Sequence, residues 1–232
     1  MRIIIIICFC ASLLSCKSKS VILEKDNTFQ SIFNGKDLEG WSGDPIYWRV
    51  ENGILIGEVT PETILKRNSF IIFEKAQPDN FELKLEYRIS KYGNSGINYR
   101  SEKIDHLPFA LKGYQCDIDG ENKYTGQNYE EKKRTTLAYK SEIVSITPMP
   151  DSISKDSLRK NITKNSWQTR TVTKTIPKKV LESSINQNGW NSVHLKVNGN
   201  KMQHYINGEL FSEVIDLDEI NRSEKGFIGV QV

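Results

Sequence analysis

Short apolar–polar alternations separated by turn residues constrain the fold of this chain more than any other feature of its sequence. Between residues 81 and 89, charged residues alternate with the set Phe81, Leu83, Leu85, Tyr87 and Ile89. A period of two predicts a strand with one buried face and one polar face. Similar short runs recur along the chain, and none shows a long helical period. The pattern therefore predicts an all-β domain.

Turn signals between these runs predict three hairpins. Asn-Gly pairs take up the positive φ angles of tight turns readily, and they occur at 52–53 and 207–208. The predicted hairpins join 47–50 to 54–57, 190–197 to 201–206, and 201–206 to 209–215. Residues 148–165, rich in Pro, Ser, Lys and Asp, are predicted to form a long loop or an insertion. The core is expected to contain Trp41, Trp48 and Trp190.

Residues 1–16 are predicted to be an export signal and not part of the fold. Arg2 precedes an apolar run, 3–14, that is too short to span a bilayer as a stable helix. The run ends in Leu-Leu-Ser-Cys at 13–16, which resembles a bacterial lipobox and implies acylation of Cys16. The alternative is an ordinary secretory peptide with an incidental cysteine. With a linker at 17–27, the chain is expected to be anchored by lipid in the cell envelope.

Cysteine usage and charge exclude several classes of protein. Cys8 and Cys10 would leave with the signal and Cys16 would carry lipid, so only Cys116 remains in the predicted mature domain, 28–232. That domain has no internal disulfide and no cysteine-based zinc site. The formal net charge is +3, with Lys and Arg scattered along the chain, which does not suggest nucleic acid as a partner.

A series of short motifs runs in one order along residues 28–232. They stand at 33–38 with 40–41, at 81–88 followed by 93–97, at 113–119, at 124–126, at 190–191 with 207–208, and at 228–231. This series resembles the 3-keto-disaccharide hydrolase family. The resemblance implies a two-sheet antiparallel jelly-roll sandwich of the concanavalin A-like lectin and glucanase type. It also implies a carbohydrate substrate class, glycosides whose sugar carries a ketone at carbon 3.

The chemistry of such a substrate sets what a site must supply. A ketone at carbon 3 makes the proton on carbon 2 acidic, so a base can remove it and the leaving group on carbon 1 departs through an enolate. Water then adds to complete the hydrolysis. This route needs a base, a group that stabilises the enolate oxygen and an acid for the leaving oxygen. It also requires a sugar 3-oxidoreductase as a partner that makes the ketone.

Glu86 is the first candidate for the base or for a metal ligand. It lies on the polar face of the strand predicted over 81–89, close to the glycine-flanked loop at 93–96. The family motif supports this role. The alternative is a solvated carboxylate that pairs with Arg88 or Lys84.

Asp117 and Asp119 are the second candidates, because they stand two positions apart on a predicted strand and so share one face, which Gln115 continues. Two acidic groups on one face favour a raised pKa, a divalent cation or hydrogen bonds to sugar hydroxyls. The alternatives are an exposed sheet edge and, for Asp119, the start of a turn.

Other residues are candidates for contacts with the sugar. Asn94 lies in a loop between glycines, and Arg100 and Arg134 could bind oxyanion or sugar oxygens. His204 could act as acid, base or ligand, although it shares a face with Met202 and Ile206 and a buried, satisfied histidine competes with that role. Stacking on a sugar ring is expected of Tyr129, with Tyr99, Tyr124 and Trp167 as alternatives.

Three functional hypotheses follow. The first is a hydrolase of 3-keto-glycosides, the second a carbohydrate-binding module without turnover, and the third a structural lipoprotein without a small ligand. An enzyme requires Glu86, Asp117 and Asp119 to converge on one site. A binding module requires only aromatic rings and hydrogen-bonding groups on a groove.

Overall fold

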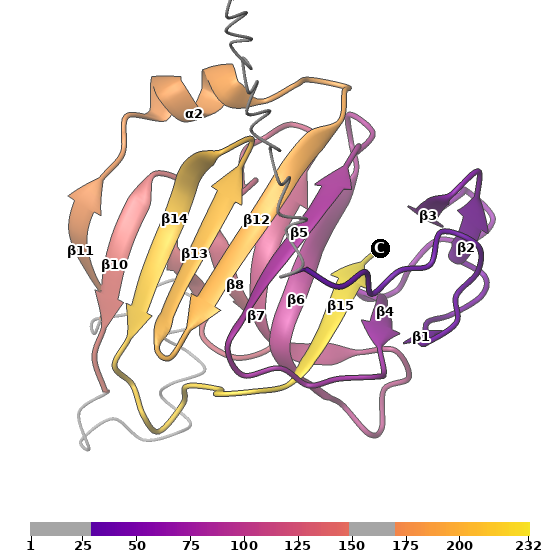
Figure 1. The fold of residues 1–232 in the computed structure, drawn as a ribbon, viewed down its shortest axis with the longest axis horizontal. Helices are drawn as coiled ribbons and strands as arrows, with labels where there is room; N and C mark the ends of the chain where they lie inside the picture. Colours follow the sequence, from indigo (N-terminus) through magenta and orange to yellow (C-terminus); the bar gives the residue numbers. More distant parts are fainter. Residues whose placement is uncertain (1–28, 149–169) are drawn as a thin grey trace, which may run out of the picture. The chain divides into compact units, whose positions relative to one another are not determined.

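Two β-sheets face each other in this computed structural model, which describes residues 29–148 and 170–232 (Figure 1). The compact unit that contains both sheets is Phe33–Val232. The first sheet has seven strands in the order β1 (Trp41–Ser42), β4 (Phe70–Phe73), β15 (Phe227–Gln231), β6 (Asn94–Lys103), β7 (Leu111–Asp119), β8 (Asn128–Glu131) and β9 (Thr135–Ala138).

The second sheet has six strands and covers the inner face of the first. Its order is β11 (Arg170–Thr175), β10 (Glu142–Ile146), β14 (Glu209–Asp216), β13 (Lys201–Ile206), β12 (Asn191–Asn198) and β5 (Phe81–Tyr87). A separate two-stranded sheet is formed by β2 (Trp48–Glu51) and β3 (Ile54–Gly57). The prediction of an all-β sandwich is confirmed.

The alternation in 81–89 predicted a strand with one buried and one polar face, and the structure shows this strand. In β5, Phe81, Leu83, Leu85 and Tyr87 are partly buried, whereas Glu82, Lys84 and Glu86 are exposed. The apolar side of β5 therefore faces the seven-stranded sheet, and its charged side forms part of the outer surface of the six-stranded sheet.

The three predicted hairpins are present. Asn52 and Gly53 join β2 to β3 with φ values of 51° and 79°, and Asn207 and Gly208 join β13 to β14 with 48° and 84°. Left-handed conformations at both positions suit a tight hairpin turn, which explains why Asn-Gly stands at each. The hairpin of β12 and β13 turns at 199–200.

The core lies between the two sheets. Fully buried side chains from the seven-stranded sheet include Tyr99, Tyr114 and Cys116, and those from the six-stranded sheet include Leu195, Met202, Ile206 and Val214. The ring of Tyr99 stacks on Tyr114 at 5.6 Å between centroids. Burying a large apolar side chain contributes about 1.5–3 kcal/mol, so this layer supplies much of the stability of a domain without disulfides.

Three features differ from the sequence-based expectations or were not among them. Strands β10 and β14 pair in parallel, although all other strand pairs in the described residues are antiparallel. A short helix, α2 (Lys178–Ser184), is anchored by the buried Leu181. Trp48 is buried as expected, but Trp190 is 41% exposed and not in the core.

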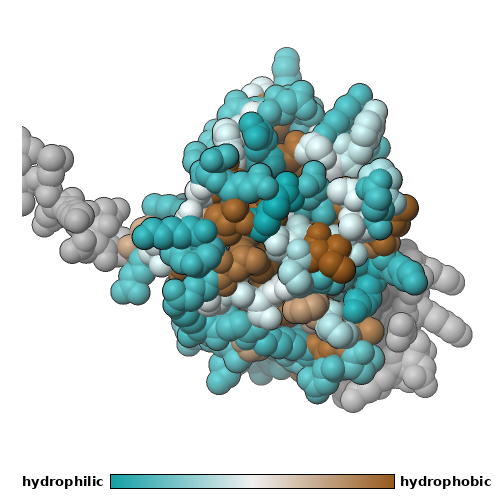
Figure 2. All heavy atoms as spheres, turned by 90° about the vertical axis from the view of Figure 1, so that its right-hand side faces the viewer, coloured by the Kyte–Doolittle hydropathy of each residue, from teal (hydrophilic) through white to brown (hydrophobic). Residues whose placement is uncertain are grey.

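Apolar side chains also lie on the surface near the two-stranded sheet. Ile46, Ile54, Val59 and Ile64 are exposed. Figure 2 shows the side of the molecule that carries β1 to β4, where hydrophobic atoms gather in several patches among hydrophilic ones.

Some expectations fall on residues that the structure does not describe. They are the signal at 1–16 with Cys16, the linker at 17–27, nearly all of the loop at 148–165, and Trp167. In the described part of the chain, no helix is long and apolar enough to cross a membrane.

Candidate functional site

The outer face of the seven-stranded sheet carries a cluster of polar side chains centred on β7. Tyr114 and Cys116 point into the core, so Gln115 and Asp117 point to the opposite face of the sheet. The expectation that Gln115 and Asp117 share a face is therefore confirmed by the strand. Asp117 is partly exposed, whereas Gln115 is buried.

Two amide side chains hold the carboxylate of Asp117. Its Oδ1 accepts a hydrogen bond from Nε2 of Gln115 at 2.5 Å, and its Oδ2 accepts one from Nε2 of Gln127. Burial raises the pKa of Asp117 to about 7, and both hydrogen bonds act against this rise because they favour the charged form. A carboxyl group with this pKa can accept and release a proton near neutral pH.

Strand β8 adds two titratable groups to the same face. The register places Tyr129 beside Gln115 and Glu131 beside Gly113. Burial raises the pKa of both Tyr129 and Glu131, and the charge of Glu131 contributes to the raised pKa of Asp117. The phenol of Tyr129 therefore stays a hydrogen-bond donor, and the carboxyl of Glu131 is protonated more easily than in water.

A third set of polar groups reaches this face from β6, β15 and the segment before β4. Nδ2 of Asn68 lies 3.4 Å from Oε1 of Glu131 and 3.4 Å from Oε1 of Gln231. Nε2 of Gln231 in turn donates to Oδ1 of Asn94 at 3.1 Å. Because Asn68 contacts side chains from strands on either side of β6 and β7, these groups converge above the centre of the sheet.

Three buried amide oxygens on this face have no hydrogen-bond donor among the described residues. They are Oδ1 of Asn98, Oε1 of Gln115 and Oε1 of Gln127. Asn98 of β6 pairs with Gln115 of β7. Gln127 directly precedes β8, and its backbone oxygen accepts a hydrogen bond from the backbone of Asp117. Buried polar atoms normally have a partner, so these acceptors are suited to hydroxyl groups of a ligand or to water.

A family model matches residues 28–232, and its description is "3-keto-alpha-glucoside-1,2-lyase-like domain". The chain belongs to this family. The curated 3-keto-disaccharide hydrolase of Bacteroides thetaiotaomicron is 35% identical over 81 residues. That match covers 32% of this chain and only 28% of the relative's length.

Solved structures of carbohydrate-active proteins have similar folds at low identity. The carbohydrate-binding module CBM66 of Bacillus subtilis is 15% identical, with a TM-score of 0.44 over 83% of this chain and 87% of that one. An endo-β-galactosidase of Clostridium perfringens that releases GlcNAcα1-4Gal is 14% identical, with a TM-score of 0.47 over 88% of this chain and 55% of that one.

Asp119 does not join the cluster in this member of the 3-keto-glucoside lyase-like family. Its carboxylate accepts backbone hydrogen bonds from Tyr124 and Thr125 at 2.9 Å each and from Lys123 at 3.0 Å. These bonds hold the turn after β7, which agrees with the alternative interpretation that Asp119 starts a turn. We therefore assign Asp119 to the support of the turn and not to catalysis.

Glu86 lies far from Asp117 in the arrangement of the sheets. It is exposed on the outer surface of the six-stranded sheet, opposite Ser192 of β12. The two sheets separate that surface from the outer face of the seven-stranded sheet. An enzyme was expected to bring Glu86 and the two aspartates together at one site. The structure does not bring Glu86 to them.

Arg100 is part of the architecture and not of the polar cluster. It is 1% exposed, and its guanidinium donates to the backbone oxygens of Asp79 at 2.8 Å, Gly199 at 2.7 Å and Ser223 at 3.4 Å. These contacts tie three loops together. They occupy the donors that were expected to bind the substrate.

Arg134 is likewise buried, and it joins the two sheets. It bonds to Glu130 of β8 at 2.5 Å, to Asp216 of β14 at 2.5 Å, and to Asp218 at 3.4 Å. The hydroxyl of Tyr114 donates to Asp216 at 2.6 Å. This network replaces the expected role of Arg134 in sugar binding with a structural one.

His204 lies fully buried between the sheets. Its Nε2 is 2.8 Å from the hydroxyl of Tyr99, and its Nδ1 is 3.3 Å from Oγ of Ser212. Burial lowers the pKa of His204 to about 4, so the ring is neutral at pH 7. The competing interpretation of a buried, satisfied histidine fits this geometry, and a catalytic role does not.

Sequence reasoning placed Gln115, Asp117, Asn94 and Tyr129 in the site region but missed Gln127, Glu131, Gln231 and Asn68. Gln127, Tyr129 and Glu131 alternate along the chain, and this period of two could have found them. Gln231 ends the last of the family motifs, at 228–231, but no site role was expected of it, and no local signal marks Asn68. Among the described residues, no group of three or more His, Cys, Asp or Glu side chains could hold a metal ion.

Proposed function

We propose that this chain is a hydrolase that cleaves 3-keto-glycosides by elimination and hydration, with Asp117 as the base. The observation that carries the proposal is the carboxyl group of Asp117, partly exposed on a polar sheet face, with a pKa of about 7. Membership of the 3-keto-glucoside lyase-like family supplies the substrate class. The deciding feature is a base that is partly ionised at neutral pH and basic enough to accept a carbon-bound proton.

In the first step, the carboxylate of Asp117 takes the proton from carbon 2 of the sugar. The electron pair of that bond forms an enolate with the ketone at carbon 3. Tyr129 is our candidate to donate a hydrogen bond to the enolate oxygen, because it neighbours Gln115 and its raised pKa keeps the phenol protonated. Hydrogen bonds aimed at a developing negative charge are among the largest contributions to catalysis.

In the second step, the enolate collapses and the bond from carbon 1 to the leaving oxygen breaks. Glu131 is our candidate for the acid that protonates this oxygen, because burial raises its pKa. The product is an enone with a double bond between carbons 1 and 2. Addition of water returns a proton to carbon 2 and places hydroxide on carbon 1, so that a free 3-keto-sugar results.

The proposal also includes a source for the substrate and an attachment of the protein to a membrane. The ketone must be made beforehand by an oxidoreductase that acts at carbon 3 of the sugar. Acylation of Cys16 would hold the domain at a membrane of the cell envelope. Lipid labelling of the expressed full chain, beside Cys16→Ser, tests this attachment.

The test of the activity is hydrolysis of a 3-keto-glucoside by the full chain, with product analysis. We expect Asp117→Asn to lose about 10²–10⁴-fold in rate, the range typical of a missing general base. Glu86→Gln is the matched control and should retain full activity, since Glu86 lies on the other sheet. Samples with and without divalent cations would run in parallel.

The products separate three outcomes. A free 3-keto-sugar supports the hydrolase, whereas accumulation of the enone would show that the chain stops after elimination. Sugar binding by the wild type without turnover would contradict the enzyme and favour the carbohydrate-binding module. Equal activity of wild type and Asp117→Asn would overturn the assignment of the base.

A further inference from the structure

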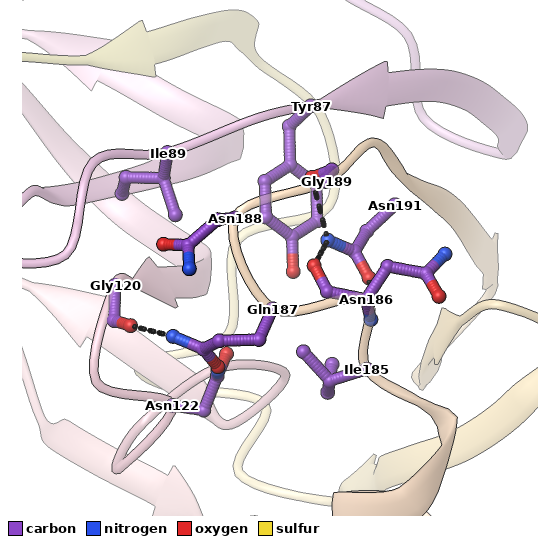
Figure 3. A pocket seen from close by; sticks show the side chains of 10 residues that line it. All are labelled: Tyr87, Ile89, Gly120, Asn122, Ile185, Asn186, Gln187, Asn188, Gly189 and Asn191. Carbon is purple, nitrogen blue, oxygen red and sulfur yellow. Dashed lines mark hydrogen bonds between the residues drawn. The ribbon is translucent and has the colours of Figure 1, made fainter.

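A small recess lies at one end of the sandwich, apart from the polar cluster of Asp117. Its lining comes from Tyr87 at the end of β5 and Ile89 just beyond it, from the turn that follows β7, and from residues 185–191, which lead from α2 into β12 (Figure 3). The recess has room for roughly one water molecule. None of its lining side chains is charged. They are apolar, phenolic or amide groups.

The hydroxyl of Tyr87 is the distinctive group in this recess. It is buried and has no hydrogen-bond partner among the described residues. Figure 3 shows it directed into the space between Asn188, Gln187 and Asn186. A buried hydroxyl without a partner is unfavourable, so a group that fills the recess and bonds to it would be favoured.

The segment that forms the wall is held in place by hydrogen bonds of its own. Oδ1 of Asn191 accepts from the backbone of Asn186 at 2.8 Å and from Nδ2 of Asn207 at 2.7 Å. Nε2 of Gln187 donates to the backbone oxygen of Gly120 at 3.0 Å, and Oε1 of Gln187 accepts from Asn122 at 2.7 Å. A wall that is already ordered loses little entropy when a ligand binds.

Two groups of this segment remain open to solvent. Asn188 is exposed, its backbone has a positive φ of 59°, and its amide makes no hydrogen bond within the described part of the chain. Trp190 stands between the lining residues Gly189 and Asn191 and is 41% exposed, with the guanidinium of Arg88 over one side of its ring at 5.2 Å. An aromatic ring beside several amides provides both an apolar face and hydrogen-bonding groups.

We propose that this recess is a second carbohydrate-binding site, which holds a neutral sugar by inserting one hydroxyl group against Tyr87. The space fits a single hydroxyl, the uncharged amide lining fits a polyol better than an ion, and exposed Trp190 flanks the site. The proposal does not depend on the chemistry of Asp117. Its place at the end of the sandwich would let the protein hold a glycan while the other face acts on it.

The test uses two-dimensional NMR of the full chain titrated with methyl α-glucoside and with a neutral disaccharide. We expect shifts of the indole signal of Trp190 and of the side-chain amides of Asn188 and Gln187. Tyr87→Phe removes a hydroxyl without a structural partner and should weaken binding by about three- to tenfold, with Asn188→Ala similar. Trp190→Ala should weaken it further.

Tyr139→Ala is the matched control, because Tyr139 is also an exposed ring with an arginine over it, Arg170 at 5.2 Å, but it lies outside the recess. It should leave the titration unchanged. Asp117→Asn should retain the shifts at Trp190 even if it has no turnover, which separates this proposal from the proposed activity. An absence of shifts at Trp190 and Asn188 with either sugar, or equal affinity in Tyr87→Phe, would overturn it.

Discussion

Gly96 of β6 lies directly across from Asp117 of β7, and a Cβ at Gly96 would stand 2.5 Å from Nε2 of Gln115. The missing side chain therefore makes room for the amide that donates to Asp117. We predict that Gly96→Ala displaces Gln115 and removes this hydrogen bond. Because the bond favours the ionised carboxyl, its loss raises the pKa of Asp117 above about 7 and moves the acidic limb of the pH–rate profile upward.

Gln115→Ala tests the same link without crowding β6. It removes the donor directly and should shift the pH–rate profile in the same direction as Gly96→Ala. A Gly96→Ala variant that loses activity at an unchanged profile would show that the glycine serves some other purpose.

The raised pKa that suits Asp117 to act as a base also predicts that its carboxyl lowers the stability of the folded protein at higher pH. The folded-state pKa of about 7 exceeds the ordinary aspartate pKa of 3.8, so this carboxyl disfavours folding progressively as the pH rises from about 4 to about 7. Its ionisation costs about 4 kcal/mol above that window. We predict that Asp117→Asn is more stable than wild type at about pH 8 and not at about pH 4. Urea unfolding at both pH values measures the difference, and equal stability at the higher pH would contradict it.

The network of Arg134 predicts a large stability loss from one substitution. Arg134 is the guanidinium that faces the buried carboxylates of Glu130, Asp216 and Asp218. Arg134→Met leaves these charges without that partner and should cost about 3–5 kcal/mol in the free energy of unfolding. Arg49→Met removes an exposed pair with Glu51 and Glu58 and should cost less than about 1 kcal/mol. Urea unfolding of both variants makes the comparison.

The two-residue alternation in the sequence predicted which side chains share a face of a strand, but not which sheet that strand joins. The alternation of 81–89 correctly separated an apolar from a charged side, yet the charged side belongs to the six-stranded sheet, so Glu86 lies away from Asp117. Which sheet a strand joins depends on pairings between residues far apart in sequence. The parallel pairing of β10 with β14 is another result of such contacts.

The polar residues that were misassigned share one physical cause. Arg100 and His204 carry the groups expected of a site, but long-range contacts bury both and satisfy them with backbone and side-chain partners. Burial of this kind is not encoded in a short motif. Gln115 and Asp117 were placed correctly because their shared face follows from the strand alone.

His204 provides the last prediction, on the stability of the core at acid pH. Its folded-state pKa of about 4 lies below the ordinary histidine pKa of 6.5, so the unfolded chain binds the proton more tightly. Stability should therefore fall as the pH drops from about 6.5 to about 4, by about 3 kcal/mol from this residue. His204→Gln removes that dependence while it lowers stability at pH 7, because the hydrogen bond to Tyr99 is disturbed. His106→Gln, in an exposed loop, removes a histidine without touching the core and should behave as wild type. Thermal unfolding between about pH 4 and pH 7 measures the slopes, and a steep acid slope retained in His204→Gln would assign the effect to other groups.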